Sequence, residues 1–150
     1  MRGFHLFSKE KKMTEDVKME TLEDAREFFG NDRFAKNAGM TIEEVGIRHS
    51  VIKLTLGDEH LNAVDALMGG VVCTMADFAC AVASNFGTGT GQYVSSDAHV
   101  SFVNACRGKE LTAEAVCIKS GRKLSYYEVA INDDTKTLIA KASVTMYRVG

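Results

Sequence analysis

Apolar and polar residues follow two different periods along this 150-residue chain, and the change of period divides it into helical and extended segments. In the range 20–38 apolar residues recur at helical spacing and are interrupted at Gly30-Asn31, so we expect one helix followed by a short helical turn. The range 42–56 instead sets isoleucines, valines and leucines among charged residues and threonines. That pattern predicts a strand or hairpin that ends at Gly57-Asp58.

The range 69–86 carries apolar or small residues around almost its whole helical circumference. This pattern predicts a helix buried on nearly all sides rather than along one stripe. Its length of about 27 Å would be enough to cross a membrane. However, Asp77 at its centre and the absence of a second apolar run argue against a transmembrane segment. We therefore expect a helix wrapped by a sheet and ended by the GTGTG run at 87–91, which lacks the lysine and element order of a phosphate-binding loop.

Four strand-like runs close the chain, with hairpin turns at Gly121-Arg122 and Asn132–Asp134. The runs cover residues 94–102, 111–119, 124–131 and 137–147, and in the first of them Val94, Ser96, Ala98, Val100 and Phe102 alternate with polar residues. The order of elements predicts an α+β fold, with one curled antiparallel sheet packed around one helix. We expect a single domain over residues 20–150, preceded by a loosely ordered charged leader at 1–19.

Composition narrows the function classes. A formal net charge of −2 offers no basic face for nucleic acid. The four cysteines have no two-residue spacing and no histidine cluster beside them, so we expect no metal site and no cofactor. Buried free thiols suit a reducing compartment, which favours a cytoplasmic protein.

Asp77 is the only charged residue in the range 69–86. A carboxylate in the middle of a buried helix is costly unless it is paired, hydrogen-bonded or functional. It lies too far from the helix start to be a cap, and no lysine or arginine lies three or four residues away. We therefore favour a functional role for Asp77, with a salt bridge from a distant strand as the alternative.

Gly69-Gly70 opens the same helix. Helix N-termini carry unpaired N–H groups at a positive dipole end, and glycine allows close approach, so this start suits an oxyanion hole for acyl transfer, with a simple turn as the alternative. Asp77 lies about 12 Å further along the axis, too far for both groups to contact one carbonyl. Two antiparallel copies of the helix about a two-fold axis would bring Asp77 of one chain to Gly69 of the other. The sequence therefore predicts a homodimer with a shared site.

Other polar residues near these positions leave alternatives open. Asn62 could donate a hydrogen bond to a carbonyl or only shape a turn. Ser95 could orient a water molecule near Asp77, or it and Ser96 could be ordinary exposed strand serines. The histidines at positions 5, 49, 60 and 99 are scattered over different elements and read as surface or turn residues rather than as a base, and no G-x-S-x-G nucleophile motif is present.

Several short runs together resemble one known family, the hotdog-fold acyl-CoA thioesterases, and within it the phenylacetic-acid-degradation (PaaI-type) branch. The runs are His60–Asn62, Met68–Gly70, Met75–Asp77, Ala83–Asn85 and Tyr126–Val129, and the resemblance covers roughly residues 31–148. It implies a long central helix wrapped by an antiparallel sheet, a homodimer that often pairs into a homotetramer, and hydrolysis of acyl-CoA to free acid and CoA.

The resemblance also implies roles for individual residues. The Gly69 N–H and Asn62 would polarise the thioester carbonyl. Asp77 of the partner chain would act as general base or nucleophile, and Ser95 would assist the attacking water. A small acyl group would be the substrate, and the branch suggests an aromatic one.

The remaining implied contacts concern substrate binding. Gly70 lies beside the carbonyl site, and the cations of Arg122 and Lys123, in the turn 120–123, suit the phosphates of CoA. Met68 stands where the family usually has histidine, and methionine cannot donate a hydrogen bond. The backbone donors survive this change, so we expect activity to persist.

Three rival functions follow from the same residues. A protein that binds acyl-CoA without hydrolysing it would fit Met68, and a thiol-trapping assay on a panel of acyl-CoAs distinguishes the two. A hotdog dehydratase would use a His-Asp pair whose histidine motif is not seen here. A DNA-binding regulator would need a recognition-helix domain, and the 38 residues before the sheet are too few and too acidic for one.

Overall fold

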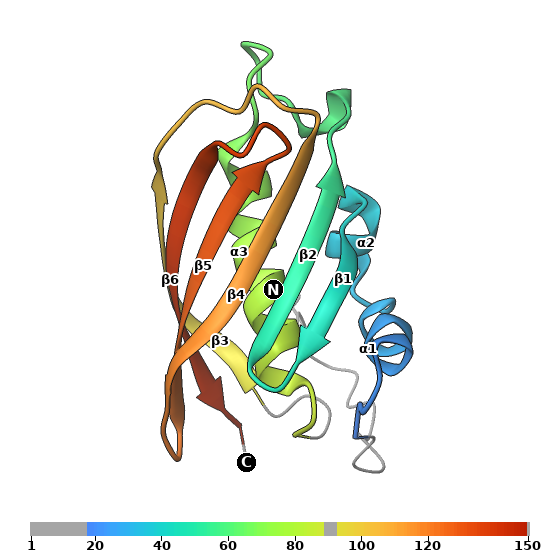
Figure 1. Ribbon diagram of the computed structural model, residues 1–150, viewed down its shortest axis with the longest axis vertical. Helices are drawn as coiled ribbons and strands as arrows, with labels where there is room; N and C mark the ends of the chain where they lie inside the picture. The colour runs from blue at the N-terminus through green and yellow to red at the C-terminus, as the bar shows by residue number, and fades with distance from the viewer. Residues whose placement is uncertain (1–17, 89–92, 150) are drawn as a thin grey trace, which may run out of the picture.

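The computed structural model describes residues 18–88 and 93–149, which form one antiparallel sheet curled around a long helix (Figure 1). In chain order the elements are α1 (Leu22–Phe29), α2 (Arg33–Ala38), β1 (Thr41–Gly46), β2 (His49–Thr55), a 3-10 turn (Asp58–His60), α3 (Gly69–Asn85), β3 (Tyr93–Phe102), β4 (Glu110–Ser120), β5 (Leu124–Asp133) and β6 (Leu138–Arg148). The strand order is β1-β2-β4-β5-β6-β3, and every neighbouring pair is antiparallel. The predicted α+β hotdog fold is confirmed.

Local capping explains why the N-terminal segment splits into two helices. Thr21 and Asp24 form a reciprocal capping box at the start of α1. The Asp32 side chain then caps α2 by accepting a hydrogen bond from the Ala35 N–H at 3.0 Å. Gly39 ends α2 in the left-handed region, at φ 85°, where glycine has no steric penalty. Both helices lie at the β1 edge of the sheet (Figure 1).

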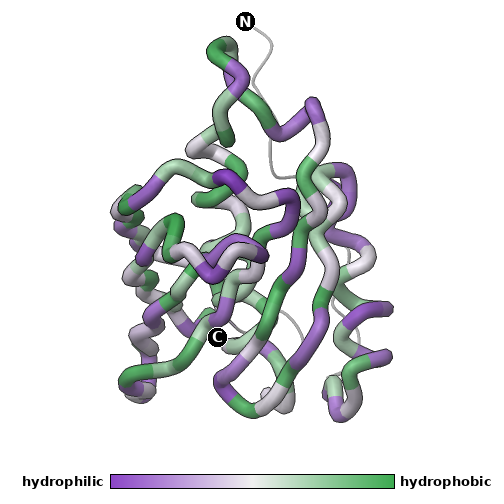
Figure 2. Tube along the Cα trace, turned by 45° about the horizontal axis from the view of Figure 1, so that its top comes forward, coloured by the Kyte–Doolittle hydropathy of each residue, from purple (hydrophilic) through white to green (hydrophobic). Residues whose placement is uncertain are grey.

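The core lies between α3 and the concave face of the sheet. Hydrophilic and hydrophobic positions alternate along the strands (Figure 2), and the buried members of each strand face the helix. Side chains such as Met75 and Val82 of α3 and Ile52, Leu111 and Ile131 of the sheet are fully buried. Each apolar side chain of this size contributes about 1.5–3 kcal/mol when it leaves water, so this layer fixes the position of α3.

The expectation that α3 is buried on nearly all sides is wrong for a single chain. Gly70, Cys73 and Asp77 are exposed, and their spacing of three and four residues places them on one stripe of the helix. The sheet covers the opposite side, while Phe78 packs towards α1 and α2. We call these three residues the open stripe. Composition could not reveal it, because two of the three residues are small or apolar.

Strand β3 is an exposed edge of the sheet, and a bulge changes which of its residues face the helix. Ser95 lies opposite the buried Met146, and after a register shift Ala98 lies opposite the buried Val144. The inserted residue is Ser96, so the predicted alternation that grouped Ser96 with Ala98 is wrong at that position. A bulge sets two residues against one and reverses the faces beyond it.

Residues 1–17 of the predicted leader, and residues 89–92 of the glycine-rich run, lie outside the described residues. Met19, at the end of that predicted leader, is fully buried, and its carbonyl accepts a hydrogen bond from the Gly87 N–H at 3.1 Å. The domain boundary at residue 20 stays a prediction. Among the described helices, none is long and apolar enough to cross a membrane.

Candidate active site

The start of α3 presents backbone donors. Met68 is the N-cap residue in an extended conformation, and no side chain caps the helix there. The Val71 N–H donates a hydrogen bond to the Met68 carbonyl at 3.0 Å. Within the described part of the chain, no hydrogen bond uses the N–H of Gly69 or Gly70. These two donors sit at the positive end of a 17-residue helix, where a carbonyl oxygen that gains negative charge is stabilised.

A small apolar cavity opens beside Gly69. Its volume is about 240 Å³, and it is lined by Ala66, Leu67, Gly69, Val72, Phe102, Asn104, Ala105, Cys106 and Ile139. A Cβ at Gly69 would lie 3.2 Å from the ring Cζ of Phe102, closer than ordinary contact. Glycine therefore lets Phe102 lie over the helix start. In the sequence, Phe102 belongs to an alternating run with Ala98 and Val100, which predicted no role for it at the site.

His60 holds the loop that leads into this helix. It is buried, its Nδ1 accepts a hydrogen bond from the Gly57 N–H at 2.8 Å, and its Nε2 donates to the Ala38 carbonyl at 2.6 Å. Its own carbonyl accepts from the Met68 N–H at 2.9 Å. Because the Ala38 carbonyl can only accept, the ring proton is on Nε2. Both ring nitrogens are occupied, so His60 is a structural turn histidine, and its burial had no signal in the sequence.

Asn62 shapes the turn between His60 and α3. Its Oδ1 accepts hydrogen bonds from the N–H groups of Val64 and Ala66, at 3.0 and 3.1 Å. Its backbone N–H donates to the Ala66 carbonyl at 2.7 Å. Of the bonds between described residues, none uses its side-chain Nδ2. The turn-forming role left open by the sequence is present, and the amide nitrogen is still able to donate.

Asp77 and Ser95 meet on the open side of α3. The Ser95 hydroxyl donates a hydrogen bond to the Asp77 Oδ1 and also lies 3.5 Å from the Met146 sulfur. No cation of the described chain pairs with Asp77, so the alternative of a salt bridge from a distant strand finds no support. The bulge in β3 is what turns Ser95, rather than Ser96, towards the acid.

Cys80, three residues after Asp77, offers no nucleophile to this acid. Burial, together with the charge of Asp77, raises the pKa of the Cys80 thiol well above its ordinary value, so Cys80 stays protonated at neutral pH. Only Cys80 is fully buried, and Cys73 is exposed, so the expectation of buried thiols fails for Cys73. No group of three or more potential ligands gathers among the described residues to hold a metal ion.

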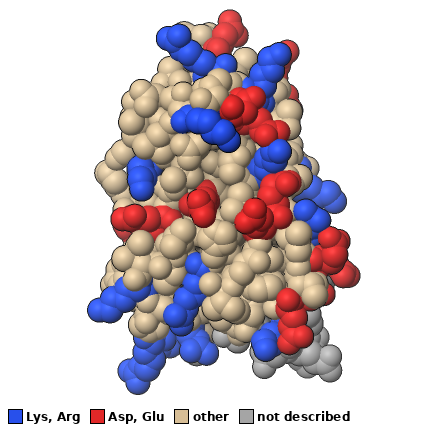
Figure 3. All heavy atoms as spheres, viewed as in Figure 1, with Lys and Arg blue, Asp and Glu red and all other residues tan. Residues whose placement is uncertain are grey.

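The other predicted substrate contacts lie at the two ends of the molecule. Met68 is 49% exposed, and its Cε lies 3.8 Å from the position of a Cβ on Gly70. Arg122 and Lys123 lie in the β4–β5 turn, at the end of the sheet opposite to the start of α3 (Figure 1). The Lys123 Nζ lies 5.7 Å from the centre of the Tyr147 ring. Lysines and arginines gather at that end of the sheet (Figure 3).

One chain therefore contains two half-sites, which it does not bring together. The start of α3 carries backbone donors and an apolar cavity, and the middle of the same helix carries a carboxylate with its hydroxyl donor. Such a set suits acyl transfer. A family model described as the thioesterase superfamily matches residues 65–140. The chain belongs to the thioesterase superfamily.

Curated relatives and solved structures agree with this membership. Of two relatives described as putative esterases, the Archaeoglobus fulgidus protein is 29% identical over 123 residues, which are 81% of this chain and 78% of that protein. The Deinococcus radiodurans protein is 33% identical over 99 residues, or 65% of this chain and 66% of that protein.

Among solved structures, the E. coli PaaI protein from the phenylacetic acid degradation operon superposes with a TM-score of 0.76 at 25% identity, covering 85% of this chain and 92% of that one. A Haemophilus influenzae thioesterase superposes with a TM-score of 0.80 at 20% identity, over 89% and 93% of the two chains, and supports the fold. The resemblance of this thioesterase-superfamily chain to the PaaI-type hotdog proteins is confirmed.

Proposed function

We propose that this protein hydrolyses acyl-CoA thioesters at an active site formed between two copies of the chain. The observation that carries the proposal is the placement of an outward-facing Asp77, bonded by Ser95, on the same helix whose first residue, Gly69, offers an unbonded N–H. Membership of the thioesterase superfamily supports the reaction class.

Each residue has a defined part in the reaction. The thioester carbonyl oxygen accepts a hydrogen bond from the Gly69 N–H, with Asn62 Nδ2 as a second donor. Asp77 of the other copy takes a proton from water as the water oxygen attacks the carbonyl carbon. The C–S bond breaks, and the proton passes from Asp77 to the departing CoA thiolate. Ser95 holds the carboxylate through its hydroxyl.

Asp77 is alternatively the nucleophile, forming an acyl-aspartate anhydride that water then opens. A single turnover in ¹⁸O-labelled water separates the two roles. Label in the Asp77 carboxylate requires the anhydride, because a general base only takes a proton from water and exchanges no oxygen with it.

A second copy is required because about 12 Å of helix axis separate Gly69 from Asp77. The open stripe of α3 and the exposed edge strand β3 border the same side of the molecule, since Ser95 of β3 bonds Asp77. An antiparallel partner helix along this side would bring the start of each α3 to the Asp77 of the other chain. We therefore propose a homodimer, with pairing of dimers into a tetramer as a further step.

The same symmetry supports the assignment of the CoA moiety. The β4–β5 turn lies at the opposite end of the molecule from the start of its own α3 (Figure 1), and an antiparallel arrangement brings the partner's helix start towards that end. Arg122 and Lys123 then suit the phosphates of a CoA ester bound at that helix start. The E. coli PaaI protein comes from the phenylacetic acid degradation operon, and this similarity supports a small aromatic acyl group.

The decisive experiment mixes two inactive variants. Asp77→Asn lacks the carboxylate, and Gly69→Val blocks the donor site. In a heterodimer, one of the two sites combines an intact Gly69 with an intact Asp77. After unfolding and refolding an equal mixture, half of the dimers are mixed, so we expect about a quarter of the parent activity.

Thiol trapping on a panel of acyl-CoAs measures that activity, and Asp77→Asn alone should lower kcat by about 10²–10⁴-fold. Circular dichroism confirms that both variants fold. Recovery of no activity on mixing would place the site within one chain. A parent that binds acyl-CoA but releases no thiol would favour the non-catalytic binding protein, for which the exposed Met68 in place of a donor is the specific observation.

A further inference from the structure

A second cavity lies on the flank of α3 that faces away from β3, under the two N-terminal helices. Its volume is about 330 Å³, within the size range of small-molecule sites. It is lined by Arg26, Phe29, Gly30, Lys36, Gly39, Met40, Thr41, Ile42 and Phe78. No residue of this cavity belongs to the acyl-transfer site described above.

The floor of the cavity is apolar and well packed. The rings of Phe29 and Phe78 meet edge to face, with centroids 5.7 Å apart. Ile42 and Met40 are buried, with 3% and 7% of their surface exposed. A ligand that enters here must present an apolar body, because a hydrated group would lose its water without gaining a partner on these walls.

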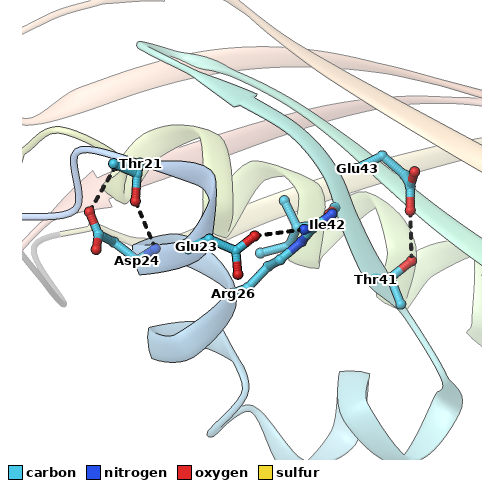
Figure 4. Close-up of polar contacts among 7 residues, drawn as sticks. All are labelled: Thr21, Glu23, Asp24, Arg26, Thr41, Ile42 and Glu43. Atoms are coloured by element: carbon cyan, nitrogen blue, oxygen red, sulfur yellow. Dashed lines mark hydrogen bonds and ion pairs between the residues drawn. The ribbon is translucent and has the colours of Figure 1, made fainter.

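The two charged side chains that line the cavity, Arg26 and Lys36, are cationic. The Arg26 Nε donates to the Ile42 carbonyl at 3.0 Å, and its Nη1 contacts the Glu23 carboxylate at 2.9 Å, which fixes the guanidinium between α1 and β1 (Figure 4). A guanidinium has five N–H donors, so three are left for another acceptor. Lys36 has no ion pair with any described acid. The carboxylate of the nearby Glu43 accepts a hydrogen bond from the Thr41 hydroxyl at 3.3 Å (Figure 4).

We propose that this cavity binds an amphiphilic monocarboxylate, a small aromatic or aliphatic acid. Its apolar body lies against Phe29 and Phe78, and its carboxylate meets Lys36 and the remaining N–H groups of Arg26. A planar carboxylate matches a fixed guanidinium, and the two cations repel a protonated amine. The site is independent of thioester hydrolysis and of the dimer that hydrolysis requires.

Methyl NMR locates the ligand directly, with 3-phenylpropanoate as the probe. We expect saturable shifts of the Ile42 and Met40 methyl signals, while the methyl of Ile139, which lines the cavity beside Gly69, stays in place. The neutral isostere 3-phenylpropanamide should bind about tenfold more weakly, because it offers no charge to the two cations. Shifts at Ile139 alone, or equal binding of acid and amide, would overturn the proposal.

Charge variants complete the test. Lys36→Glu should weaken 3-phenylpropanoate about tenfold. Lys136→Glu, the same change in the β5–β6 turn, should leave the dissociation constant unchanged. Asp77→Asn should also bind the acid as the parent does, which separates this site from the catalytic proposal. Binding that is unaffected by Lys36→Glu, or lost in Asp77→Asn, would contradict the assignment.

Discussion

Replacing His60 by alanine should destabilise the protein far more than its position in a short turn suggests. The imidazole is 3% exposed and joins two separate segments, accepting from the Gly57 N–H at 2.8 Å and donating to the Ala38 carbonyl at 2.6 Å. His60→Ala leaves one donor and one acceptor without partners, at about 1–3 kcal/mol each. We therefore expect a loss of about 2–6 kcal/mol in the free energy of unfolding.

Urea denaturation followed by circular dichroism measures this loss as a lower midpoint with an unchanged slope. His49→Ala is the matched control, because the His49 Nε2 bonds the exposed Glu114 carboxylate at 2.9 Å on the outer face of the sheet. Such an exposed pair contributes about 0–1 kcal/mol. If both variants lose the same amount, or if His60→Ala loses less than about 1 kcal/mol, the imidazole does not hold the loop as described.

Three further substitutions test the proposed site and the β5–β6 hairpin. Gly69→Ala should lower kcat/KM with little loss of fold, because the new Cβ lies 3.2 Å from Phe102 and the ring must move into the cavity; steady-state kinetics and a thermal melt measure both. Ser95→Ala should lower kcat about tenfold or more while the KM for acyl-CoA is unchanged. Hydrogen bonds from Thr135 and from neighbouring backbone N–H groups lower the pKa of Asp133 from 3.8 to about 2. Its ionised form therefore stabilises the fold above about pH 4, and this contribution is lost as the pH falls through 2. Asp133→Asn should be less stable at pH 7, with a shallower decline in urea midpoint between pH 4 and pH 2 than the parent shows.

The helices and strands could be predicted from the sequence because each depends on residues close together in the chain. Periodicity marked the strands, and Gly30-Asn31 marked the break between the two N-terminal helices. The open stripe could not be predicted from the sequence, because Gly70 and Cys73 occur equally well on a helix face buried within one chain and on a face that another chain covers. The bulge in β3 could not be predicted either, since it depends on register against β6, and it decides that Ser95 rather than Ser96 reaches Asp77.

Cavities and buried polar anchors depend on contacts between segments far apart in the chain, which no spacing rule reveals. His60 reaches Ala38 across 22 residues. The Arg26 guanidinium is fixed by the Ile42 carbonyl, 16 residues away. The sequence predicted the chemistry of the proposed acyl-transfer site because Asp77 breaks the apolar pattern of its helix. It predicted nothing at the second cavity, where every lining residue fits its own element.

The proposed dimer accounts for features that would be liabilities in an isolated chain. An edge strand with free backbone groups invites uncontrolled pairing, and β3 exposes 48% of Val94 and 59% of Phe102. The adjoining open stripe offers glycine and cysteine, which are small enough for another helix to approach closely. A partner that covers both surfaces would bury this apolar area and also withdraw Asp77 from bulk water. Burying the Asp77 carboxylate is costly. The same carboxylate needs the second copy to reach a carbonyl, so assembly and catalysis would depend on the same contact.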